Sequence, residues 1–86
     1  MARFHNQLKV MFFIGNEPIL YDEKYSEHNK MSKDSSIYLD LESMVDVKIL
    51  DILLKSNIVE LQGKVYTIVE FHFMIDGTAL YVTVSK

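Results

Sequence analysis

Apolar and polar positions alternate in the first and last parts of the chain and recur at helical spacing in the middle. Residues 6–14 are predicted to form a strand, since its even-numbered apolar residues share one face at a period of two. These residues are Leu8, Val10, Phe12 and Ile14. Met11 and Phe13 add apolar groups to the other face, so we expect this strand to lie in the centre of a sheet.

The segment after this strand carries turn signals and then a long polar run. Gly15 and Pro18 indicate a turn, and residues 19–21 are expected to return as a short strand. Residues 22–36 are rich in charged side chains and predict a surface loop. Loops of this length are uncommon in compact domains, and the sequence leaves open whether this one is functional or only tolerated. A short strand is expected to follow at residues 37–39.

Apolar residues at helical spacing predict one α-helix over residues 44–55. Ser43 is the expected N-cap, and Asp46 follows it in the capping-box position. The alternation of Val45, Val47 and Ile49 leaves a strand as the alternative. The expected apolar stripe of the helix consists of Val45, Ile49, Ile52 and Leu53, widened by Leu50 and Leu54.

Two long strands, over residues 65–75 and 78–85, are predicted to end the chain as a hairpin. They are joined by Asp76 and Gly77, and Asp-Gly between apolar runs is typical of a type I′ turn. This turn puts apolar residues opposite each other on one face. The expected pairs are Phe73 with Leu80, Phe71 with Val82, and Val69 with Val84, while His72 lies opposite Tyr81 on the other face.

A further strand at residues 58–61 leads into a turn at Gly63. A two-residue loop places Val59 and Leu61 on the face of Tyr66, and a three-residue loop places them on the opposite face. The two-residue loop would leave apolar groups on both faces, which calls for a partner chain or for closure into a barrel. The sequence therefore predicts a single α+β domain over residues 1–86. Its antiparallel sheet has four to five strands, open or curled into a small barrel.

Composition narrows the class of protein. The chain has 86 residues, 49% of them hydrophobic, which is sufficient for one folded domain. It has no cysteine, which fits a reducing compartment, and no apolar run long enough to span a membrane. We expect a cytoplasmic protein without membrane contact, and a homodimer would supplement the small core. The net charge of −3 and the scattered lysines argue against a nucleic-acid partner.

Catalytic and metal-binding patterns were sought among the polar residues. His5, His28 and His72 do not have the spacing of a metal site, and there is no thiolate to assist them. The serines lack a nucleophile-elbow context, and the three glycines are isolated. We therefore expect no enzyme activity, no cofactor and no metal site.

Binding to another protein is the expected role. Tyrosine is enriched at interaction surfaces, although tyrosines also occupy half-buried sheet positions that bind nothing. The contact surfaces are expected in the loop region of residues 22–40 and on a face shared by Tyr66 and Tyr81. The candidate protein-binding residues are Tyr25, His28, Tyr38, Tyr66, His72 and Tyr81.

The last third of the chain resembles a known group of proteins. The run VELQGKVYTIV at residues 59–69, followed by LYVTV at residues 80–84, is similar to the G-K-x-Y-x-V hairpin and V-x-V strand of small bacteriophage and prophage proteins. The resemblance implies an accessory protein that binds and inhibits a host protein in the host cytoplasm, such as a defence nuclease or a transcription factor. The alternatives are a homo-oligomeric structural protein of a virion and a small-barrel nucleic-acid-binding module.

Overall fold

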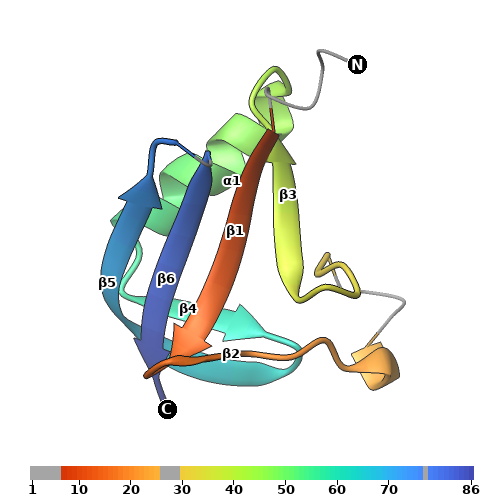
Figure 1. Ribbon diagram of the computed structural model, residues 1–86, viewed down its shortest axis with the longest axis vertical. Helices are drawn as coiled ribbons and strands as arrows, with labels where there is room; N and C mark the ends of the chain where they lie inside the picture. Colours follow the sequence, from red (N-terminus) through yellow and green to blue (C-terminus); the bar gives the residue numbers. More distant parts are fainter. Residues whose placement is uncertain (1–6, 26–29, 77) are drawn as a thin grey trace.

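The computed structural model describes residues 7–25, 30–76 and 78–86, which form six strands and one α-helix (Figure 1). The α+β class is confirmed, but the sheet has six strands where four to five were expected, and it is not closed into a barrel. A single turn of 3-10 helix lies at Glu23–Tyr25. In chain order the other elements are β1 (Gln7–Ile14), β2 (Glu17–Pro18), β3 (Ser36–Asp40), α1 (Met44–Lys55), β4 (Ile58–Leu61), β5 (Lys64–Met74) and β6 (Ala79–Ser85).

The strand β1 is central, as its apolar pattern predicted. It pairs with β6 along one edge, while β3 and β2 pair with the first and last parts of its other edge. The pair β1–β6 is parallel, unlike the antiparallel arrangement expected for the whole sheet. On the other side of β6 the sheet continues through β5 to β4. The expected strand at residues 19–21 is absent, and the short strand β2 lies two residues earlier, at Glu17–Pro18.

The core lies on one face of this sheet. The helix α1 and the strand β4 both lie on that side, behind β1 and β6 in Figure 1. Val10, Val82 and Val84 are each at most 2% exposed and form its centre. The remaining buried side chains of the cluster are Leu8, Phe12, Ile19, Met31, Leu39, Tyr66 and Leu80.

A β-bulge in β5 changes which of its residues face the core. The ladder with β6 pairs Ile68 with Val84 and then shifts register before Glu70, which leaves Val69 as the extra residue. The predicted pair of Val69 with Val84 is therefore wrong, and Val69 is 59% exposed. The bulge brings Ile68 and Tyr66 onto the face of Phe71, so the apolar residues on both sides of the bulge point the same way.

The turn at Gly63 has the two-residue alternative, with Val59 opposite Tyr66, whereas the last hairpin differs in part from its prediction. Gln62 and Gly63 both have positive φ angles, 51° and 79°, and form a two-residue turn that pairs Leu61 with Lys64. The type I′ geometry expected at Asp76 occurs here instead. The last hairpin has the predicted pairs from Phe71 to Phe73, but its ladder ends at Met74–Ala79, and Thr78 has a positive φ of 48°. Gly77 lies outside the described residues.

The helix α1 has the predicted bounds and cap, so the alternative strand is wrong. The Ser43 hydroxyl accepts a hydrogen bond from the Asp46 amide at 3.3 Å. Ile49, Leu50 and Leu53 pack on the core, but no residue of α1 is fully buried. The expected stripe was too wide, because Val45 and Ile52 are 68% and 63% exposed.

The polar run after β2 is attached to the β4–β5 turn. The Gln62 side-chain amide donates to the Leu20 carbonyl at 3.0 Å, and its oxygen accepts from the Asp22 amide at 2.7 Å. Met31, which the sequence placed in a surface loop, is 3% exposed and belongs to the core. This region is therefore packed on the domain at both of its described ends.

Replacing Gly63 by alanine should destabilise the fold more than the same change at Gly15. Both glycines have positive φ, so an alanine at either position costs about 1–2 kcal/mol of folding stability, because a Cβ is disfavoured in the left-handed conformation. A Cβ at Gly63 would also lie 3.2 Å from the Tyr25 ring, whereas nothing lies within 4 Å of one at Gly15. Urea unfolding of both variants measures the difference, and an equal loss would contradict the Tyr25 contact.

Replacing Thr78 by asparagine should stabilise the protein by up to about 1 kcal/mol. A β-branched residue is disfavoured at the positive φ of Thr78, and asparagine tolerates that conformation better. Thr83→Asn is the matched control, because Thr83 lies within β6 and should lose stability through its lower strand propensity. A lower urea midpoint for Thr78→Asn would show that the turn has another conformation.

Candidate protein-binding face

Among the described residues, α1 lies behind the sheet in Figure 1, and no helix of that part of the chain covers the opposite face. We call it the front face, defined by residues of β1, β3, β5 and β6 that point away from the core. Its apolar and aromatic members form a band across four neighbouring strands, and its charged members include Lys9, Asp40 and Glu70. The band consists of Met11, Phe13, Tyr38, His72, Met74 and Tyr81.

Tyr81 is the centre of this face. The register places it between Met11 of β1 and His72 of β5. Its ring centroid lies 5.1 Å from that of Phe13, tilted by 56°, and 6.4 Å from that of His72, at an interplanar angle of 25°. Cross-strand aromatic contacts of this kind hold side chains in a fixed orientation. Tyr81 is half-buried, and these two rings lie on either side of it.

A shallow hollow adjoins Tyr81 at one end of the face. It has a volume of about 290 Å³ and extends from the β1–β2 turn at Gly15 to β5. Its lining combines polar residues, among them Glu70 and His72, with the apolar residues Phe13 and Met74. This mixture of apolar and polar groups suits a side chain of another protein, which needs apolar contact and a hydrogen-bond partner.

At the β3 end of the face, Tyr38 is oriented by a hydrogen bond. Its hydroxyl donates to the Asp34 carboxylate at 2.6 Å, and the same carboxylate accepts from the Ser36 amide at 3.1 Å. The bond to Tyr38 is the main reason why the pKa of Asp34 is below its usual value, and the same hydrogen bond is the main reason why the pKa of Tyr38 is raised. Tyr38 is 41% exposed, so its ring remains available for contact.

Three of the six predicted binding residues meet on the front face: Tyr38, His72 and Tyr81. Tyr66 does not, because the bulge turns it into the core, where it is 5% exposed. The expected face shared by Tyr66 and Tyr81 therefore does not exist. Tyr25 lies against Gly63, and His28 lies outside the described residues.

Met11, Phe13 and Met74 were missed as members of this surface. The sequence did signal two of them, since Met11 and Phe13 form the second apolar face of β1. They were interpreted as covered from both sides, whereas both are only half-buried. No second layer lies over the front face in the part of the chain that the structure describes.

Metal-binding clusters and membrane-spanning helices are absent from the described residues. Apart from residues 1–6, 26–29 and 77, the chain holds no cluster of three or more histidine, cysteine, aspartate or glutamate side chains that could hold a metal ion. The described helix α1 is too short and not apolar enough to cross a membrane.

Comparison with protein-family profiles, with curated proteins and with solved structures gave no match to this chain. The assignment of a function therefore depends on the geometry of its surfaces.

Replacing Tyr38 by phenylalanine should return the pKa of Asp34 toward its ordinary value. The folded-state pKa of Asp34 is lowered, so the stability from this bond is present above the unfolded-state pKa and is lost as pH falls through the folded-state pKa. A carboxyl ¹³C NMR titration measures the change. Tyr81→Phe removes a hydroxyl from the same face without touching Asp34, and it should leave that titration as it is.

Proposed function

We propose that this protein is a small accessory domain that binds another protein through its front face. The observation that carries this proposal is the uncovered band of aromatic and methionine side chains centred on Tyr81. Aromatic residues and methionine are enriched at protein interfaces, where they provide a large apolar area with few rotamers to restrict.

The charge of this face favours a protein over a nucleic acid as its partner. Lys9 is a cationic residue of the front face, Asp40 and Glu70 are anionic residues of it, and the whole chain carries a net charge of −3. Binding to a phosphate backbone needs several cations at one surface. A protein surface needs only apolar contact with a few polar groups at its edge.

The identity of the partner is proposed from the hairpin resemblance. The segments at residues 59–69 and 80–84 are similar to those of small phage and prophage proteins that bind host proteins. We therefore infer that the partner is a host protein, such as a defence nuclease or a transcription factor, and that binding inhibits it. A host protein captured from a bacterial lysate by the tagged domain is the first measurement.

The binding face is tested by two matched substitutions in one strand. Met74 points to the front face and Phe73 to the core side, and both are partly exposed, at 36% and 56%. Met74→Lys, alone and combined with Tyr81→Ala, should weaken capture of the host protein at least tenfold, because a charge would enter the contact. Phe73→Lys should leave capture unchanged.

Equal loss in both variants, or retention with Met74→Lys and Tyr81→Ala together, would contradict the front face as the contact. Light scattering of the unmodified protein tests the alternative of a homo-oligomer. A defined oligomer that dissociates with Met74→Lys would show that the face binds a second copy of the chain.

A further inference from the structure

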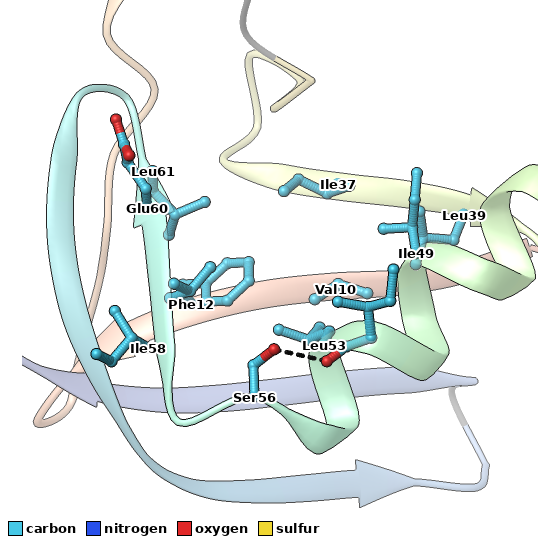
Figure 2. A pocket seen from close by; sticks show the side chains of 12 residues that line it. Val10, Phe12, Ile37, Leu39, Ile49, Leu53, Ser56, Ile58, Glu60 and Leu61 are labelled. Atoms are coloured by element: carbon cyan, nitrogen blue, oxygen red, sulfur yellow. Dashed lines mark hydrogen bonds between the residues drawn. The ribbon is translucent and has the colours of Figure 1, made fainter.

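An apolar groove lies on the other side of the sheet, between α1 and β4 (Figure 2). Its floor is formed by Val10 and Phe12 of β1 together with Ile37 of β3, and Leu53 of α1 forms one wall. Its volume is about 290 Å³, and the Ser56 hydroxyl, the polar group of the helix wall, donates to the Ile52 carbonyl at 2.7 Å. The groove therefore offers apolar contact on its floor and on the helix side.

The opposite wall is the unpaired edge of a strand. β4 pairs with β5 along one edge, and the other edge faces α1 across the groove in Figure 2. The Ile68 amide donates to the Asn57 carbonyl at 2.8 Å, which fixes the phase of the antiparallel ladder. Since bonded and non-bonded pairs alternate, the amides and carbonyls of Ile58 and Glu60 point away from β5, toward the groove.

We propose that this groove binds an extended peptide segment of another protein, which adds to the sheet beside β4. The backbone groups of Ile58 and Glu60 that point away from β5 form a template for pairing with another strand. An extended chain has donors and acceptors at the matching spacing. Successive side chains of such a segment point to opposite sides. One set enters the groove over Phe12, and the other lies beside Ile58 and Glu60 on the outer side.

The composition of the peptide follows from these two environments. The inward set meets Phe12, Ile37 and Leu53, so it is apolar. The outward set lies beside Glu60, which is the charged residue of the lining, so it includes a lysine or arginine. A second copy of this chain fits less well, because its own β4 offers an acidic residue and no basic one.

The test uses one probe on the unmodified protein: the acetylated and amidated heptapeptide Thr-Val-Lys-Val-Lys-Val-Thr. Its addition should shift the amide NMR signals of Phe12, Ile37 and Leu53 and leave those of the front face unchanged. Two N-methylated forms of the peptide carry methyl groups either on the valine amides or on the lysine amides. Because N–H groups of a strand point alternately to either side, one form should lose binding and the other keep it.

Two substitutions in the protein test the same contact from its other side. Glu60→Pro removes an amide that points into the groove and keeps the ladder with β5. This substitution should weaken binding of the peptide at least tenfold. Glu60→Lys should weaken it by about tenfold through charge, whereas Glu17→Lys, the same change at an exposed site in β2, should not. Circular dichroism establishes that each variant is folded.

Absence of shifts in the groove at millimolar peptide would overturn the proposal, as would equal binding of both N-methylated forms. A concentration-dependent dimer that is lost with Glu60→Pro would show that a second copy occupies the groove. All of these outcomes concern the groove between α1 and β4. They therefore do not test the proposal for the front face.

Discussion

The parallel pairing of β1 with β6 is the contact on which the rest of the structure depends. It joins the part of the chain up to Asp40 to the C-terminal hairpin, and the sheet is continuous only through it. Val10, Phe12 and Ile14 lie opposite Leu80, Val82 and Val84, so one apolar layer crosses the junction. Parallel strands need a long connection. Here the connection between β1 and β6 contains β2, β3, α1, β4 and β5, which is most of the domain.

The bulge at Val69 determines which surfaces this sheet leaves uncovered. Without the extra residue, Tyr66 and Phe71 would point to opposite faces, and α1 could cover only one of them. With it, both face the core, and Glu70 and His72 join Tyr81 on the front face. A bulge also bends its strand. The bend carries the first part of β5 and its neighbour β4 across the core side of β1, where β4 becomes a wall of the groove.

The features that could be predicted from the sequence are those that depend on residues close together along the chain. The alternation in β1, the Ser43 cap and the pairing of Phe73 with Leu80 depend on local periodicity and turn chemistry, and all three are present. The bulge and the parallel pair depend on contacts between distant segments, which periodicity does not register. The position of Tyr66 was missed for this reason. One inserted residue in a strand moves every side chain beyond it to the other face of the sheet.

The front face and the groove lie back to back on the same strand. Phe12 forms the floor of the groove and Phe13, the next residue, forms part of the aromatic band, so their side chains leave β1 in opposite directions. β1 is held on both edges, by β6 and by β3 and β2, which leaves it little freedom to rotate or slide. Coupling between two sites needs an element with two arrangements, and the pairing described for β1 holds the strand that both proposed contacts share in one arrangement. The two proposed contacts would use different side chains of one strand, and we expect the affinity of each to be independent of the other.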